Sequence, residues 1–466
     1  MINKINEALK RRKSEWLEEL AALVRQRSIS ASGEGVEECA ELFAEIMRSS
    51  GIEAQVHYVH EGKGKPYPFV TGLAAACAAD GTPIEGAPTM LVYGHYDVKP
   101  AGDLSEWLSD PFEPEIRDGR MYGRGVSDNK CQIFMYVKAV QICKEEFGSL
   151  PCNVKFIFEG GEEEGSPGLA EFLRSHRELL ASDFCLNSDG AMHESHRPTI
   201  KLGTKGYYAP ILEITCANRD VHSMHGPTVP SAVWRMIEVL SSIRRFEDSY
   251  VLIDGFYDDI RPISDEEKAA LDSMPNDGAV TLEELQLDHF AMGPHGDDYN
   301  YNFVFEPSSN INSIRGGFPG PGDNNVVAHY CRARLDFRLV PDQDARDIHE
   351  KFMKHLEKHG FTDVKVTPGE LGTKPVRIPV TNKYVQTIIG CLRDAYGKEP
   401  IVYPNGAGSG PLSTFSEAVG VETAILPMCA ADQCEHAPNE NMRLEDFEDG
   451  IRACTLMLVR LGEMGK

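Results

Sequence analysis

The chain has 466 residues, 41% of them hydrophobic and 26% charged, so it is long enough for two or three domains with sizeable cores. Its 47 basic and 72 acidic residues leave a formal net charge of −25, which argues against nucleic acid or an anionic membrane surface as the main partner. The N-terminus lacks the apolar core of a signal peptide, no run of about 18 apolar residues predicts a membrane span, and twelve cysteines without a CxxC pair indicate reduced thiols in the cytoplasm.

Apolar strands alternate with amphipathic helices in the first part of the chain. The predicted order is helix 4–27, helix 34–50, extended segments 53–59 and 68–76, strand 89–93, helix 131–146, strand 153–158, helix 168–180 and strand 183–187. This alternation is typical of an α/β domain, in which a mainly parallel sheet is covered by helices on both faces.

The pattern changes near residue 204. The predicted order becomes strand 205–216, helix 230–246, a stretch rich in Asp, Pro and Gly over 253–325, strand 331–340, helix 343–359 and strand 361–367. Long alternating strands with few helices predict a smaller α+β domain with a half-exposed sheet. The first pattern then returns, with helix 381–396, strands 400–403 and 422–428, and helix 443–462. We therefore expect an α/β domain, 1–203 and 373–466, interrupted by an inserted α+β domain, 204–372.

Five segments carry histidine or acidic residues just beyond an apolar strand or in a loop. They are TMLVYGHYDVKPAG (89–102), GRGVSDNK (123–130), FIFEGGEEEGS (156–166), FCLNSDGA (184–191) and DQCEHAPNE (432–440). In open α/β sheets, ligands bind beyond the carboxyl ends of strands, so these segments can meet there. Taken singly each is an ordinary turn or helix start, but together they favour one site. Its expected members are His95, Asp128, Glu162, Glu163, Asp189 and His436.

The residue types in this set predict a metal site. Carboxylates gathered in one cleft repel one another unless cations compensate them. Two imidazoles and three carboxylates suit zinc, and also manganese or cobalt. One carboxylate can bridge two ions about 3.5–4 Å apart, and such a pair lowers the pKa of bound water toward about 7 and holds the attacked carbonyl oxygen. A spare glutamate beside a ligand would then serve as general base.

These motifs also resemble a known family. GHYDVKP, GRGVSDNK, EGGEEEGS, the SDG after a strand and CEHAPNE follow in the order and spacing of the M20 metallopeptidases, and the resemblance covers most of the chain. The run EWLSDPFEPEIRDGRMYGRGVSD resembles the carnosine-type dipeptidase branch. The resemblance implies a dinuclear-metal catalytic domain with an inserted lid or dimerisation domain, and cleavage of dipeptides or short peptides that carry a free C-terminal carboxylate. An N-acyl amino acid deacylase of the aminoacylase or desuccinylase type and a non-catalytic binding homologue are the alternatives.

The resemblance assigns roles position by position. It implies two divalent ions per chain, zinc before manganese or cobalt, held as follows: His95 and Asp189 at one ion, Glu163 and His436 at the other, and Asp128 bridging both. Glu162 would be the general base. Asp97 would orient His95, since a metal-bound histidine usually needs a partner for its other ring nitrogen.

Further resemblances concern the substrate. RDVHSMHG is similar to the family's Asp-Leu-His-Ser-Gly segment, which implies a homodimer in which His222 polarises the substrate carbonyl in the neighbouring subunit's site. LDFRLVP implies that Arg338 binds the substrate's carboxylate through the two parallel donors of its guanidinium. Arg332 and Arg334 share its strand face by the period of two, so either could take its place.

NGAGSGP resembles the family's glycine-rich substrate loop and assigns Gly408 and Ser409 as backbone and hydroxyl contacts. The chain also departs from the family pattern. Asn129 replaces a second Asp, Cys131 replaces a Gly, Met224 stands where Gly follows His-Ser, and Asn325, an expected substrate contact, stands where dipeptidases often have Thr. These departures bear on substrate preference and on the turn around Asp128.

Overall fold

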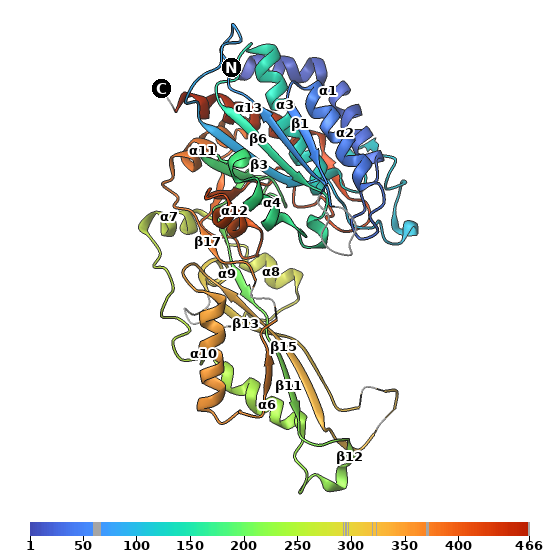
Figure 1. Cartoon of the computed structure of the whole chain (residues 1–466), viewed down its shortest axis with the longest axis vertical. Helices are drawn as coiled ribbons and strands as arrows, with labels where there is room; N and C mark the ends of the chain where they lie inside the picture. Colours follow the sequence, from blue (N-terminus) through green and yellow to red (C-terminus); the bar gives the residue numbers. More distant parts are fainter. Residues whose placement is uncertain are drawn as a thin grey trace. The chain divides into compact units, whose positions relative to one another are not determined.

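The computed structural model describes residues 1–58, 67–291, 293, 296, 298–318, 320–322, 324–369 and 372–464. The chain forms two compact units (Figure 1). The first comprises Met1–Leu202, Ile378–Val402 and Thr414–Lys466, and the second comprises Gly203–Arg377 and Tyr403–Ser413. The segment Tyr403–Ser413 thus belongs to the second unit, whereas the sequence pattern placed it in the α/β domain. Val59, the last residue of the predicted strand 53–59, lies outside the described residues.

An eight-stranded sheet forms the centre of the first unit, in the order β1-β2-β6-β3-β7-β19-β8-β18. The inner strands β6, β3, β7 and β19 run parallel, and β1 and β2 on one side and β8 on the other are antiparallel to their neighbours. The predicted α/β class is confirmed, with the parallel strands at the centre of the sheet. The strands are β1 (Glu53–His57), β2 (Phe69–Ala74), β3 (Thr89–His95), β6 (Asn153–Glu159), β7 (Phe184–Asn187), β8 (Thr199–Lys201), β18 (Ile401–Tyr403) and β19 (Thr423–Ile425).

Helices cover both faces of this sheet because successive strand residues point to opposite sides. Val92 and Phe156 pack on one face against five helices, and Leu91 and Ile157 pack on the other face against three shorter ones. The five are α1 (Ile2–Arg25), α2 (Val36–Ser49), α3 (Cys131–Glu146), α11 (Lys383–Tyr396) and α13 (Leu444–Glu463). The three are α4 (Leu169–Ser175), α5 (Arg177–Leu180) and α12 (Leu412–Ala418). The described helices include none long and apolar enough to cross a membrane.

Short elements beside the sheet lead into the candidate site. A three-stranded sheet joins β4 (Glu115–Arg117), β5 (Arg120–Tyr122) and β20 (Asn441–Arg443). Helical turns occupy Leu104–Glu106, Val126–Lys130 and Glu162–Glu164. The last two carry Asp128 and the Glu162–Glu163 pair.

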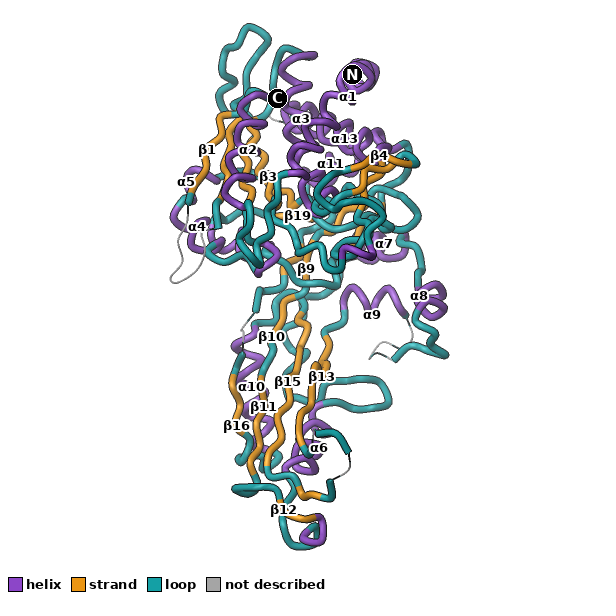
Figure 2. The backbone as a smooth tube through the Cα atoms, turned by 90° about the vertical axis from the view of Figure 1, so that its right-hand side faces the viewer, coloured by secondary structure: helices purple, strands orange, loops and turns teal. Residues whose placement is uncertain are grey.

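The second unit is built on a smaller antiparallel sheet, with strands β10-β15-β11-β16 and with β13 also paired to β15 (Figure 2). Its core lies between this sheet and the helices α6 and α10. The elements are β10 (Gly206–Tyr208), β11 (Ile211–Thr215), β13 (Ser308–Gly316), β15 (Tyr330–Leu339), β16 (Lys365–Thr367), α6 (Ala232–Ile243) and α10 (Ala345–Lys358). Shorter elements are β9 (Gly203–Thr204), β12 (Val221–His222), β14 (Val326–Val327), β17 (Val376–Arg377), a turn at Ser223–His225, α7 (Asp265–Ser273), α8 (Gly278–Glu284) and α9 (Tyr299–Phe305).

Candidate metal centre

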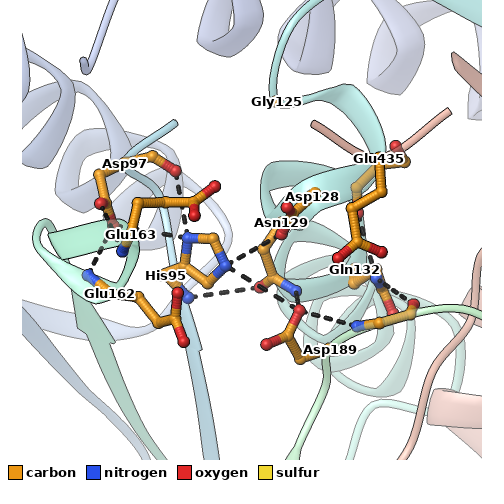
Figure 3. A network of polar contacts seen from close by, with 12 residues as sticks. His95, Asp97, Gly125, Asp128, Asn129, Gln132, Glu162, Glu163, Asp189 and Glu435 are labelled. Carbon is orange, nitrogen blue, oxygen red and sulfur yellow. Dashed lines mark hydrogen bonds and ion pairs between the residues drawn. The ribbon is translucent and has the colours of Figure 1, made fainter. Parts of the chain in front are cut away.

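His95 is the last residue of β3, and Asp97 follows it at the carboxyl end of the sheet. The His95 side chain is almost fully buried, and its Nδ1 lies 3.1 Å from the main-chain oxygen of Asp97 and 3.4 Å from Asp97 Oδ1. The two oxygens of the Asp97 carboxylate also accept the backbone N–H groups of Glu162 and Glu163, each at 3.1 Å (Figure 3). Asp97 therefore connects the end of β3 to the glutamate turn after β6.

Asp128 lies between two imidazoles. Its Oδ1 is 3.1 Å from Nε2 of His95, and its Oδ2 is 3.0 Å from Nε2 of His436. The turn Val126–Lys130 that carries it leads directly into α3. One carboxylate thus faces a different histidine with each oxygen, which is the arrangement that a bridge between two cations requires.

A further carboxylate stands on each side of Asp128. Asp189, just after β7, has its Oδ1 3.9 Å from His95 Nε2, and Glu163 has its Oε1 3.1 Å from His436 Nε2. Ligand atoms of His95, Asp128 and Asp189 lie within 4.8 Å of one another. The geometry therefore brings all five predicted ligands together.

Glu435 is an additional carboxylate that the sequence analysis did not single out. It precedes His436, and its ligand atom lies within 4.8 Å of those of Asp128 and His436. Burial, followed by the charges of Asp128 and Asp189, raises the pKa of Glu435 to about 7. The sequence did contain a signal for this residue: Glu435 stands next to His436 in CEHAPNE, a motif with two acidic residues.

The electrostatics of the cluster fit a cation site. Burial and the neighbouring carboxylate Asp128 raise the pKa of both Glu163 and Asp189. The hydrogen bond to Asp128 raises the pKa of His436 to about 9. Burial opposes the ionisation of Asp128, but hydrogen bonds from His436 and His95 hold its pKa well below the usual range. The raised pKa of His436 reflects the negative charge of the surrounding carboxylates, which divalent ions with N and O ligands would offset.

Asn129, one of the departures from the family pattern, contacts two of the candidate ligands. Its Nδ2 donates to the main-chain oxygen of Ser188 at 2.5 Å and to Asp189 Oδ1 at 3.1 Å, and its Oδ1 accepts from the backbone N–H of His95 at 3.3 Å. The amide thus links the ends of β3 and β7. An aspartate could accept the His95 bond but could not donate to Asp189 while ionised.

Three of the predicted substrate residues meet in the second unit. Arg338 on β15 donates through Nη1 to Ser409 Oγ at 2.9 Å and lies 3.2 Å from Asp336. The main-chain oxygen of Gly408 accepts from the backbone N–H of Lys205 at 2.8 Å. Among the described residues, Arg338 contacts the glycine-rich loop, and Arg332 and Arg334 do not.

The remaining predicted substrate residues, His222 and Asn325, lie close together at the end of the short β12–β14 ribbon. His222 is exposed, and it pairs with Val326 across the ribbon. The main-chain oxygen of Asn325 accepts from the backbone N–H of Ser223 at 2.8 Å. Met224, at the tip, is 73% exposed.

Known proteins resemble this chain over most of its length. Beta-Ala-His dipeptidase of Homo sapiens is 26% identical over 424 residues, covering 90% of this chain and 82% of its own. Cys-Gly metallodipeptidase DUG1 of Saccharomyces cerevisiae is 27% identical over 387 residues, covering 79% and 78%.

Solved structures share the fold. The M20 family metallo-carboxypeptidase Sso-CP2 from Sulfolobus solfataricus has a TM-score of 0.82 at 29% identity, covering 96% of this chain and 99% of its own. Human carnosine dipeptidase 1 has a TM-score of 0.76 at 24% identity and covers 99% of both chains, which is a likeness of fold. Residues 91–460 match peptidase family M20/M25/M40, which confirms the resemblance drawn from the motifs. The chain therefore belongs to peptidase family M20/M25/M40 and is a metallopeptidase.

Proposed function

We propose that the protein is a dinuclear metal-dependent dipeptidase that cleaves the amide bond of substrates with a free C-terminal carboxylate. One observation carries the proposal: the two oxygens of Asp128 lie 3.1 Å from His95 Nε2 and 3.0 Å from His436 Nε2. Two similar proteins are named for dipeptide hydrolysis, Beta-Ala-His dipeptidase and Cys-Gly metallodipeptidase, which favours dipeptides over N-acyl amino acids.

The proposed ligands divide between two ions. His95 and Asp189 would hold one, Glu163 and His436 the other, with Asp128 shared, and the ligand types suit zinc before manganese or cobalt. When bound, the ions would polarise the attacked carbonyl and lower the pKa of water. Glu435 is close enough to replace or support a ligand on the His436 side.

Glu162 is the proposed general base. A base works best with a pKa near the operating pH. Burial, partly offset by His95 and reinforced by the carboxylate Asp189, raises the pKa of Glu162 to about 7. The hydrogen bond from its backbone N–H to Asp97 fixes the turn. Glu162 takes a proton from the attacking water and passes it to the leaving amine.

Arg338 is proposed to bind the substrate carboxylate, with Ser409, Gly408 and Asn325 as further contacts. The guanidinium is partly exposed and already bonded to Ser409, so the hydroxyl holds it in place while donors remain for a ligand. His222 of the partner subunit would polarise the substrate carbonyl.

We also propose a homodimer formed through the second unit. An apolar groove of about 390 Å³ lies between α6 and β13, lined by Ile237, Leu240, Phe246, Ile311 and Ile314 among others. The side chain of Phe246 is 76% exposed and that of Ile314 is 50% exposed. Apolar surface of this kind on an edge strand favours pairing with another chain. Sedimentation should give twice the 51.6 kDa of one chain, and a single 51.6 kDa species would refute the dimer.

All twelve cysteines are described and all are free thiols, which supports a reducing compartment, and we propose the cytoplasm. Fractionation of the native cells would test this, and recovery outside the cytoplasm would contradict it.

The substrate class is tested by a panel assayed after loading with zinc, manganese or cobalt. It should contain dipeptides, the matching dipeptide amides and N-acetyl amino acids. Dipeptides should have the highest kcat/KM, and their amides should be much poorer. Preference for N-acetyl amino acids would replace the dipeptidase proposal by a deacylase, and no hydrolysis of any member would refute both.

A further inference from the structure

A buried ion pair lies beneath the loop that carries Asp128. Arg124 Nη1 and Glu440 Oε2 are 2.7 Å apart, and their side chains are 2% and 0% exposed. Burying such a pair contributes little net stability, because the loss of hydration offsets the attraction between the charges. Stability alone therefore does not explain the pair.

Within the described residues, every hydrogen bond to the Glu440 side chain comes from residues 124–128. Oε2 accepts from Arg124 and from the backbone N–H of Gly125 at 2.9 Å. Oε1 accepts from the N–H and the hydroxyl of Ser127, each at 3.0 Å, and from the N–H of Asp128 at 3.1 Å. Successive N–H groups that converge in this way form an anion-binding concavity. Here the bound anion is the carboxylate of the chain itself.

Gly125 permits this turn. Its φ is 84°, a left-handed conformation that glycine adopts without strain. A Cβ atom at this position would lie 2.3 Å from Cγ1 of Val98. The backbone can therefore wrap around the Glu440 carboxylate only with glycine at 125.

Glu440 also belongs to the loop that carries His436. Its main-chain oxygen accepts from the backbone N–H of Gly123 at 3.0 Å, and Arg124 Nη2 lies 3.4 Å from the main-chain oxygen of Ala437. The loop around Asp128 and the loop around His436 are 315 residues apart in sequence where Gly125 meets Glu440. The Arg124–Glu440 pair joins them next to the pairing of β5 with β20.

We propose that Glu440 and Arg124 are positioning residues that hold the carboxylate of Asp128 at a fixed distance from the imidazole of His436. The inference rests on the proposed dinuclear centre. Both ions would share Asp128, so a shift of its turn would weaken both. Partners that orient metal ligands typically change metal affinity about 10- to 100-fold when they are removed.

The test is metal binding by Glu440→Gln, which keeps the shape but turns one acceptor oxygen into an NH₂ group that faces N–H donors. Apo protein is titrated with Co²⁺ while the visible absorption of the ion, which reports its coordination, is recorded. We expect affinity to fall about 10- to 100-fold relative to the unaltered protein, with a changed absorption band. Arg124→Lys, which keeps the charge but not the fork, should show a smaller loss in the same direction.

Glu267→Gln is the matched control. Glu267 is also buried and forms an ion pair with an arginine, Arg377, at 2.8 Å, but it lies in the second unit. The variant Glu267→Gln should lower Tm and leave Co²⁺ binding unchanged. If Glu440→Gln lowers Tm while Co²⁺ affinity and absorption stay as in the unaltered protein, the pair is merely structural and the inference is overturned.

Two further outcomes can be told apart from a failure of the inference itself. If the unaltered protein fails to bind two Co²⁺ ions, the proposed centre itself fails. If Glu440→Gln does not fold, Arg124→Lys carries the test, and normal Co²⁺ binding by that variant would overturn the inference.

Discussion

Asp97 and Asp128 each use both carboxylate oxygens, but their partners differ. Asp97 accepts the N–H groups of Glu162 and Glu163 at 3.1 Å while it also faces His95. Asp128 presents its oxygens to His95 and His436 at 3.1 and 3.0 Å. The Asp97 carboxylate accepts hydrogen bonds from the protein backbone, so it can fix the orientation of the candidate ligand His95. The Asp128 carboxylate lies among nitrogen and oxygen ligands, so it can bind ions.

Glu162→Gln should separate catalysis from metal binding. The change removes the proposed base but not a ligand, so kcat should fall about 10²- to 10⁴-fold while metal content stays at that of the unaltered enzyme. Glu164→Gln is the control, because Glu164 lies in the same turn but is exposed. Steady-state kinetics and metal analysis check both variants. Near-normal turnover by Glu162→Gln would show that the base is elsewhere.

Arg338→Ala should erase the preference for a free carboxylate. A hydrogen bond to a charged group contributes about 1.5–3 kcal/mol, so the unaltered enzyme should favour a dipeptide over its amide about 10- to 100-fold in kcat/KM. Arg334→Ala is the control, because Arg334 lies on the same strand but is exposed. Equal rates on acid and amide in the unaltered enzyme would remove this role from Arg338.

The five candidate ligands were predictable from sequence because most follow apolar strands, and the carboxyl ends of parallel strands meet at one edge of a sheet. Glu435 and Glu440 were not predicted, because they lie in a loop without periodicity. What distinguishes Glu440 is a set of donors 312–316 residues away, and no local pattern encodes it. In the sequence, Asn129 was noted only as a departure from the family pattern. Its bond to Asp189 could not be predicted, because it depends on the approach of two strands.

At the scale of elements, the alternation of strands and helices was sufficient for the first unit, and α3 begins and ends at the predicted residues 131 and 146. Some of the predicted elements were wrong in detail. Helix 168–180 breaks at His176 into α4 and α5, and strand 205–216 is interrupted between β10 and β11 at Pro210, which has no N–H for the ladder.

No helix or strand was assigned from the sequence to the stretch 253–325, which is rich in Asp, Pro and Gly. The structure places the helices α7, α8 and α9 and the strand β13 there. A local signal was present at α7, where Ser264 and Glu267 form a capping box. The short helices elsewhere in the stretch have too few turns for a helical period to stand out.

Helix α10 should make the second unit sensitive to acid. Burial, followed by the charge of His359, lowers the pKa of His355 to about 4, and its Nε2 lies 3.0 Å from Ser242 Oγ on α6. A lowered histidine pKa favours proton uptake by the unfolded chain. Stability is therefore full above about pH 6.5 and falls toward pH 4, by about 3 kcal/mol at most.

Chemical unfolding from pH 7.5 to 4 checks this, with His355→Gln and the exposed His359→Gln compared with the unaltered protein. The free energy of unfolding of His355→Gln should depend less on pH than that of the other two proteins. Parallel curves for all three would show that His355 does not couple folding to protons.

At the scale of the whole molecule, the proposed active site needs two chains. It would combine Glu162 of one chain with His222 of the other. Homodimers of Glu162→Ala and of His222→Ala should both be nearly inactive, but a mixed dimer would hold one site with both lesions and one with neither. Since random mixing makes about half of the dimers mixed, about a quarter of the normal activity should return.

Co-expression with two different tags allows the mixed dimers to be isolated and assayed. Mixed dimers as inactive as their parents would show that His222 acts within its own chain or has no part in the reaction. The matched control is a mixed dimer of Glu162→Ala with Glu164→Gln. This dimer should keep activity whether His222 acts in its own chain or in the partner's site.

Two ions held around Asp128 are proposed to enable dipeptide hydrolysis. A titration of chelator-treated protein with Zn²⁺ during a continuous dipeptide assay tests this most directly. We expect no activity before metal is added, a rise that ends at two equivalents per chain, and no recovery when Asp128→Ala is titrated in the same way. Full activity in the chelated protein, or unimpaired recovery by Asp128→Ala, would show that hydrolysis does not depend on ions at Asp128.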